Sequence, residues 1–564
     1  MCQIKVMSVL FDMDLSVLTA ELKELVGLAL PISLNCILNI TMATVDLMFV
    51  GHLNSAHLLA ACALANVYFT LVTFPLNGYL TALDTRLGQA YGRKDFKNYG
   101  DNVQTALYSV NVGMVGLVLA LYFAEDVFLA CGQDPMVSRF AGEFVGRLIS
   151  GLWPYCMCMV IMKFLNAQKL NTFVAVFNLV SNILNVFFNW LLVHHLEMGI
   201  VGSPYATSLS RWVQFLLNTT YLWWVWDDIK PTWPQWDVRV CNAMLPDFIR
   251  LAIPGAAMLA VPTFAYEIST FLSGLLSVEE MGANSILINF NAVLFMGSLF
   301  GLSIAGCIRV GHVIGAGLPG HDIRYTCEVM VAFVSVVMFV VALASTILRR
   351  QVGYMFTGDE SIIAIIEDVE PVQSFLLIVN APALAYQAIL LALGKQETSF
   401  WVNVIGFWVC GIPVGAFLTF DLDMGVAGLW WGIVTGMFVM MFANKWLVER
   451  VDFDNLEEEG GSGSEREKAA LKLKREQEWD PEATGVMYTE ALRDTPSERA
   501  GLLGGHTKST SSLVVPDEDS FAMASPVGTA IQMKRMRKGS MGEAPSPGPG
   551  QGKDRSGSYG SMQK

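Results

Sequence analysis

The sequence predicts an all-α integral membrane protein with twelve transmembrane helices. They form two six-helix lobes related by a pseudo-two-fold axis along the membrane normal. Composition is the first indication: 53% of the residues are hydrophobic, only 15% are charged, and the mean hydropathy is +0.47. A soluble protein of this length is far more polar. An internal repeat and a series of long apolar stretches are the second and third indications.

The repeat relates residues 51–92 to residues 274–315 at a constant offset of 223, without a gap. Twelve of the 42 aligned positions are identical, and both copies end in R-x-G-x-x-x-G, which matches Arg86 with Arg309. A second, shorter similarity relates MGIVG at 198–202 to MGVAG at 424–428. Duplicated membrane segments are typical of transporters.

Twelve stretches are apolar and, at about 20 residues or more each, long enough to span a bilayer. We expect the spans near residues 25–50, 58–88, 102–124, 141–166, 170–194, 200–226, 248–275, 283–314, 325–348, 368–393, 397–420 and 425–448. Six spans fall in each half, and because this number is even, both halves insert with the same orientation.

Basic residues gather in the loops after even-numbered spans, so the positive-inside rule predicts that both termini are cytoplasmic. The expected parts are a cytoplasmic N-terminus at 1–24, an N-lobe at 25–226, a cytoplasmic linker at 227–247, a C-lobe at 248–448 and a tail at 449–564. The tail is rich in charge, Ser, Gly and Pro, a composition that predicts disorder. Within it, 465–478 could form a charged helix, and 533–540 could touch anionic lipid.

Several functional classes lack their signatures. The ten cysteines show no C-x-x-C or His/Cys ligand spacing, so we expect free thiols, no metal site and no cofactor. The sequence has no phosphate-binding loop of an ATP-driven pump, no polar constellation of a membrane enzyme and no repeated channel filter. We expect a monomer whose partners are small solutes, ions and the lipid bilayer, and no nucleic acid.

Two polar stripes mark the interior of the first half. Asn35, Asn39, Met42 and Asp46 follow one helix face of the first span. The fifth span repeats that spacing, with Asn178, Asn182, Asn185 and Asn189. Amides facing lipid would lack partners, so both stripes should face the bundle or a wet cavity. The asparagines are either interhelical hydrogen-bonding groups or part of a site, whereas the ionisable Asp46 predicts function.

The second half has its own acid, Glu267, in the seventh span, with Thr263, Thr270 and Phe271 at helical spacing. Burial favours the neutral form of a carboxyl, and a polar or cationic neighbour favours the charged form. Such a balance suits a group that binds and releases a proton in each cycle. At offset 223, Asp46 matches Ser269 and Glu267 matches Thr44, so the two acids should lie on different faces of equivalent helices.

The strings TALDTRLGQAYGRKD and GLSIAGCIRVGHVIGAG resemble the paired signatures of the multidrug and toxic compound extrusion (MATE) family. YEISTFLSGLL resembles the seventh helix of eukaryotic members, and VDLMFVGHL resembles the first helix of prokaryotic members, where an acid at the position of Asp46 is implicated in cation coupling. The resemblance covers roughly residues 20–448. It implies two lobes forming a V around a central cavity, and antiport of organic solutes against H+ or Na+.

The chain departs from this pattern at several positions. Pro262 stands where relatives often carry a second glutamate, and Asn289 and Asn380 appear in place of acids of the eighth and tenth helices. Coupling is therefore expected to depend on Asp46, Glu267 or both, with the asparagines named above lining the substrate cavity. The alternative is a flippase for lipid-linked sugars, which a cavity with several basic residues would favour. Arg86 and Arg309 are expected to bond backbone carbonyls and lipid phosphates, without touching substrate.

Overall fold

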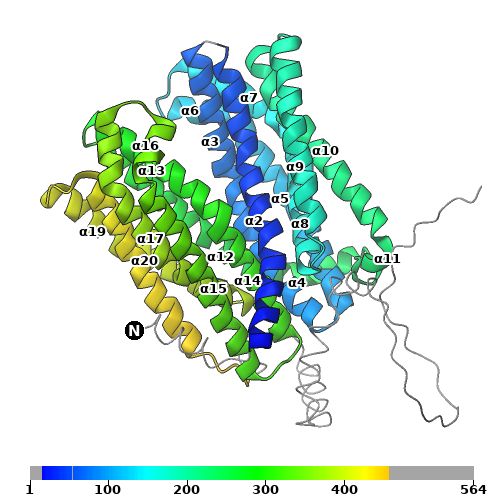
Figure 1. Cartoon of the computed structure of the whole chain (residues 1–564). Coiled ribbons are helices and arrows are strands. Elements are labelled where there is room, and N and C mark those ends of the chain that lie inside the picture. Colours follow the sequence, from blue (N-terminus) through cyan, green and yellow to red (C-terminus); the bar gives the residue numbers. More distant parts are fainter. Residues whose placement is uncertain (1–14, 54, 457–564) are drawn as a thin grey trace, which may run out of the picture. The chain divides into compact units, whose positions relative to one another are not determined.

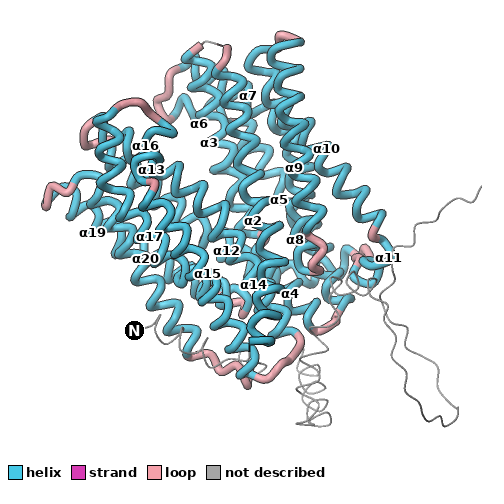
Figure 2. Tube along the Cα trace, in the orientation of Figure 1, coloured by secondary structure: helices cyan, strands magenta, loops and turns pink. Residues whose placement is uncertain are grey.

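The computed structural model describes residues 15–53 and 55–456, and all regular structure in this part of the chain is helical (Figures 1 and 2). The tail segments 465–478 and 533–540 lie outside the described residues.

The helices of the first half are α2 (Leu15–Gly51), α3 (Ala56–Tyr79), α4 (Thr81–Gly92), α5 (Phe96–Tyr122), α6 (Ala124–Ala130), α7 (Pro135–Leu148), η1 (Ile149–Gly151), α8 (Leu152–Ala167), α9 (Thr172–Asn189), η2 (Trp190–His195), η3 (Gly199–Val201) and α10 (Gly202–Trp224). The short helices α11 (Trp226–Ile229) and η4 (Lys230–Thr232) lie between the halves.

The second half contains α12 (Val238–Ser273), α13 (Val278–Leu294), η5 (Phe295–Phe300), α14 (Gly301–Gly315), α15 (Gly320–Ile347), α16 (Arg349–Phe356), α17 (Glu360–Ala392), α18 (Gln396–Asn403), η6 (Val404–Gly411), α19 (Ile412–Ala416), η7 (Phe417–Asp421) and α20 (Gly425–Glu449).

Each of the twelve expected spans is helical. Eleven helical segments among the described residues are long and apolar enough to cross a membrane. The expected sixth span is α10, a helix of 23 residues whose first half is rich in Ser and Thr. The starts of two helices differ from the prediction: α2 begins at Leu15 rather than residue 25, and α12 begins at Val238 rather than residue 248. Helix α2 therefore extends over residues that were assigned to the N-terminal segment.

Local sequence signals fix several helix starts. The Asp95 side chain accepts a hydrogen bond from Asn98 N at the start of α5, and Asp134 accepts from two amides at the start of α7. A Ser277–Glu280 capping box begins α13. These side chains satisfy amides that have no partner within their own helix.

The sequence similarity between residues 198–202 and 424–428 has a conformational cause. Gly199 and Gly425 both adopt positive φ, +59° and +56°, which glycine tolerates better than other residues. The Met198 and Met424 amides then donate to carbonyls six residues back, at 3.0 and 3.2 Å. The sequence motif thus marks two equivalent turns, one before the last span of each half.

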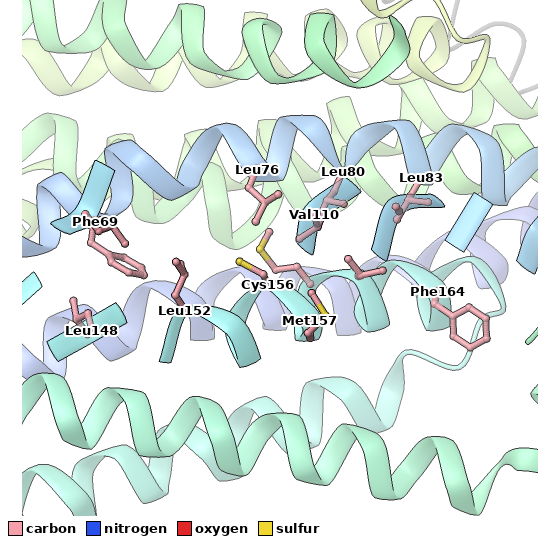
Figure 3. Packing of buried hydrophobic residues seen from close by; sticks show 14 of the residues in the cluster. Phe69, Leu76, Leu80, Leu83, Val110, Leu148, Leu152, Cys156, Met157 and Phe164 are labelled. Carbon is pink, nitrogen blue, oxygen red and sulfur yellow. The ribbon is translucent and has the colours of Figure 1, made fainter. Parts of the chain in front are cut away.

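The helices of each half pack around their own apolar core, and the first helix of each half also packs on the other half (Figure 1). Helix α2 contacts α9 and also α14, and helix α12 contacts α18 and also α3. Figure 3 shows part of the core of the first half, where Leu76 of α3 faces Cys156 and Met157 of α8. The nine cysteines of the described residues are free thiols, as expected.

The matched glycines of the repeat lie where α4 meets α14. A Cβ on Gly88 would be 3.3 Å from Ile308 O, and a Cβ on Gly311 would be 3.3 Å from Gly88 Cα. Added Cβ atoms on Gly92 and Gly315 would collide with the carbonyls of His312 and Gln89, which are themselves equivalent at offset 223. The glycines are therefore repeated because the two helices touch backbone to backbone across the pseudo-two-fold axis.

Hydrogen bonds between the halves gather at the same end. Gln89 Nε2 donates to Ala392 O at 2.7 Å, and the equivalent His312 Nε2 lies 2.8 Å from Ala167 O. Because a carbonyl only accepts, this His312 nitrogen carries a proton. Thr85 Oγ1 adds a bond of 2.6 Å to Leu391 O. The two halves are thus joined at the end where α4 and α14 finish, which we call the closed end.

Candidate coupling and substrate sites

The two asparagine stripes, which the sequence predicted to face the bundle or a wet cavity, contact each other in the first half. Helices α2 and α9 run parallel, and Asn178 Nδ2 donates to Asn35 Oδ1 at 3.0 Å. The same sequence separation of 143 joins Asn189 Nδ2 to Asp46 Oδ1, also at 3.0 Å. The four fifth-span asparagines, Asn35 and Asp46 are buried, and Asn39 is exposed. Most of the stripe therefore lies between helices.

Asp46 is 1% exposed and is surrounded by hydrogen-bond donors. Thr207 Oγ1 of α10 lies 2.8 and 2.7 Å from the two carboxylate oxygens, and Asn185 Nδ2 donates to that hydroxyl oxygen at 3.0 Å. Donors of this kind stabilise the ionised form of a carboxyl that burial disfavours. The site can therefore hold either a charged carboxylate or a carboxyl neutralised by a small cation.

The same cluster also offers unused acceptors. The amide oxygens of Asn182 and Asn189 are buried and have no hydrogen-bond partner among the described residues. Amide oxygens and a carboxylate are suitable ligands for a hard cation. Asp46 and Asn189, which are hydrogen-bonded to each other, thus fit a coupling cation chemically, whether a proton on the carboxylate or a cation with oxygen ligands, whereas Asn182 lies two turns away on α9.

Sequence reasoning missed Thr207. Its signal was present in the sixth span, where Ser203, Thr207, Ser210 and Arg211 follow helical spacing on one face. A hydroxyl in the membrane needs a hydrogen-bond partner just as a carboxyl or an amide does. The structure adds Thr207 to the candidate coupling site.

Glu267 lies in a different setting. It is exposed on α12, on the face that also carries the exposed Phe264 and Phe271. Its repeat counterpart Thr44 is exposed as well, whereas Asp46 and its counterpart Ser269 are both buried. The prediction that the acids occupy different helix faces is therefore confirmed. An exposed carboxylate that shares its helix face with two exposed aromatic residues is suited to contact with an organic cation.

Comparison with known proteins gives the family. The MatE family model matches residues 31–191 and 254–417, which is more than half of the chain and includes parts of both halves. The chain belongs to the MatE family. Multidrug and toxin extrusion protein 1 of Homo sapiens is 31% identical over 425 residues, covering 74% of this chain and 73% of that protein. Multidrug and toxin extrusion protein 2 of Mus musculus is 28% identical over 439 residues, with 78% and 76% covered.

Solved MATE structures share the fold. The eukaryotic MATE transporter AtDTX14 superposes with a TM-score of 0.72 at 25% identity, covering 78% of this chain and 98% of that one. The Vibrio cholerae MATE transporter VcmN in its bent form gives a TM-score of 0.69 at 16% identity, covering 77% and 97%. The twelve-helix fold expected from the sequence is therefore confirmed, and the chain is a membrane transporter.

The remaining predicted residues of this MatE protein are dispersed. Asn289 is exposed and donates to Ser285 O at 2.8 Å, and Asn380 is buried. Within residues 15–53 and 55–456 no hydrogen bond joins either of them to Glu267. The structure also reveals the buried acid Glu370, which accepts hydrogen bonds from Ser345 and Ser374 between α15 and α17. The sequence analysis did not single out Glu370, although it falls within the expected tenth span.

The repeated arginines bind the first helix of the opposite half. Arg86 donates to Asp247 O at 2.8 Å, in agreement with the expected carbonyl contact. Arg309 forms a two-pronged ion pair with Glu21, at 2.6 and 3.0 Å, a partner that the sequence analysis did not predict. The reason is the early start of α2, which places Glu21 inside a helix that packs on α14. Both arginines therefore join the two halves at the closed end.

Proposed function

We propose that this MatE protein is a secondary antiporter that exports small organic solutes, cationic or amphipathic, in exchange for H+ or Na+. The observation that carries the proposal is the pair of membrane-embedded acids in different environments, Asp46 enclosed by donors and Glu267 exposed beside aromatic rings. The names of the relatives, which refer to multidrug and toxin extrusion, support the same class of substrate.

In this proposal the two acids bind different ligands. Asp46 takes the coupling cation, because its site is small, buried and polar. Glu267 meets the charge of the organic solute, because it is accessible and flanked by Phe264 and Phe271. The exposed Asn39 and Asn289 contribute cavity wall, and the buried Asn380 would do so only in another conformation. The coupling site is positioned by the buried asparagines of the two stripes: Asn35, Asn178, Asn182, Asn185 and Asn189.

The closed end supports alternating access. By the positive-inside rule this end faces the cytoplasm, together with both termini. Export then requires the bonds of Thr85, Gln89 and His312 across the halves to break so that the site opens inward, and to re-form after release outside. The protein is proposed to work as a monomer in the plasma membrane or an organelle membrane.

The flippase alternative fits less well. A lipid-linked sugar carries phosphates and needs several available cations. Of the membrane-embedded basic residues, Lys163 pairs with Asp84 at 2.5 Å, Arg309 pairs with Glu21, and Arg86 binds a backbone carbonyl. These three cations already have protein partners. A fourth, Arg211, lies against the Phe69 and Tyr155 rings, so the chain does not offer the several available cations that a phosphate-bearing solute needs.

The experiment is transport by the full chain in liposomes, with a fluorescent organic cation inside and pH and Na+ gradients imposed separately. Efflux that follows one of the gradients supports the proposal and identifies the ion. Efflux that ignores both gradients would contradict antiport, and gradient-independent movement of a lipid-linked phosphate would favour the flippase.

A further inference from the structure

One half-buried cation, Arg211, lies against aromatic rings rather than against an acid. Arg211 lies on α10, one turn after Thr207, and its guanidinium carbon is 4.5 Å from the centre of the Phe69 ring and 4.8 Å from that of Tyr155. The two rings belong to α3 and α8, and their centres are 6.2 Å apart at 61°. Phe69 lies at one end of the core side chains drawn in Figure 3. Three helices of the first half thus bring two aromatic faces to one guanidinium group.

The rings replace the usual partners of such a group. Among the described residues no carboxylate lies within ion-pair distance of Arg211, and its Nη1 atom is buried without a hydrogen-bond partner. Its charge interacts through space with Asp46 of α2, and the other ionisable groups near it are the weak acids Tyr155, Cys156 and Cys158 of α8. A guanidinium group with a buried Nη1 atom is normally paired, and one held mainly by ring faces within a membrane protein indicates function.

A pair of aromatic faces is also the surface that binds organic cations in many proteins. Here that surface is already occupied by a cation of the chain itself. A soluble cation entering the same place would have to displace Arg211 and then remain beside its charge. The arrangement is therefore unfavourable for an organic cation in the first half, although the nearby Asp46 would otherwise attract one.

We propose that Arg211 is a specificity-determining residue that fills the aromatic slot between Phe69 and Tyr155 and so excludes organic cations from the first half. Bulky organic cations then cannot bind in the slot next to the coupling site. They bind at Glu267 in the second half instead. This inference rests on the proposed function and gives a structural reason for its division of labour.

Arg211→Gln tests the inference, because glutamine keeps much of the length and removes the charge. The probes are 10-methylacridinium, a permanent cation, and acridine at a pH where it is neutral. Binding to the purified full chain in nanodiscs is followed by probe fluorescence. We expect Arg211→Gln to bind 10-methylacridinium about tenfold more tightly than the wild type, with the affinity for acridine nearly unchanged.

Two further variants separate charge from packing. Arg211→Lys keeps the charge and should retain wild-type affinity for the cation. Arg147→Gln is the matched control, because Arg147 also lies over a tyrosine ring, 5.8 Å from the centre of Tyr205, but is exposed and pairs with Glu143. It should leave both affinities unchanged. An equal gain in Arg211→Lys and Arg211→Gln would overturn the charge argument.

A double variant locates the new binding. Glu267→Gln alone should weaken binding of 10-methylacridinium, and adding Arg211→Gln should restore it through the vacated slot. Adding Phe69→Leu to that double variant should remove the restored binding. Unchanged or weaker cation binding in Arg211→Gln, with the protein monodisperse and the wild type binding both probes, would overturn this inference alone. A wild type that neither binds nor transports any organic probe would overturn the proposed function and the inference with it.

Discussion

Substitution of Gly92 by alanine tests whether the closed end opens during transport. An added Cβ would lie 2.9 Å from the His312 carbonyl carbon and 3.0 Å from Ala316 N, and closer still to the His312 oxygen. All three atoms belong to the backbone, so a change of rotamer cannot relieve the overlap. Helices α4 and α14 would have to separate by about 1 Å, at a cost of the order of 1–3 kcal/mol for an overpacked contact.

That cost applies only to the conformation in which α4 and α14 touch. If transport requires the closed end to open, Gly92→Ala shifts the equilibrium toward the inward-open conformation by roughly 5- to 150-fold. The assay is electron–electron distance measurement between spin labels at Lys97 and His321, exposed residues of the two halves near the closed end, in a Cys131→Ser background.

We expect a longer-distance population in Gly92→Ala that is small in the parent protein. Gly146→Ala is the control, because a Cβ at Gly146 meets no atom within 4 Å. If Gly92→Ala and Gly146→Ala give the same distance distribution as the parent, the closed end does not open in the way proposed.

Two other predictions concern Glu267 and the arginines Arg86 and Arg309. Glu267→Gln should weaken binding of a cationic substrate by about tenfold and abolish its gradient-driven efflux, while a neutral analogue binds as before; equal losses for both probes in binding titrations would refute contact with the substrate's charge. Arg309→Ala should lower stability by about 3–5 kcal/mol, because it removes the cation paired with the fully buried Glu21, and Arg86→Ala should cost less. Thermal unfolding in detergent and a substrate panel check this, and a changed substrate profile at normal stability would place these arginines in the cavity instead.

The sequence was sufficient for the fold because the repeat, the span lengths and the basic loops each report on local chain properties. The asparagine stripes were readable in the same way, because amides at helical spacing are expected to face protein or a wet cavity, and all the stripe residues except the exposed Asn39 are buried. That Asp46 and Glu267 lie on different helix faces also followed from the repeat, since two residues along a helix turn a side chain to another face. The exposure of Glu267 did not follow, because the sequence analysis treated it as a buried carboxyl.

Partners that come from distant helices could not be predicted in this way. Thr207 reaches Asp46 across 161 residues, and Arg309 reaches Glu21 across 288. Such pairs depend on how each helix rotates about its axis in the bundle, which the hydrophobic pattern of one helix does not fix. The aromatic setting of Arg211 likewise requires α3, α8 and α10 together.

The central claim is that Asp46 carries the coupling cation, and substitution by the neutral, nearly isosteric asparagine tests it most directly. The measurement compares gradient-driven efflux with exchange of labelled for unlabelled substrate in liposomes containing Asp46→Asn or the wild type. The account predicts that Asp46→Asn loses efflux driven by the ion gradient but retains substrate binding and exchange. Gradient-driven efflux at the wild-type rate in Asp46→Asn would contradict the account.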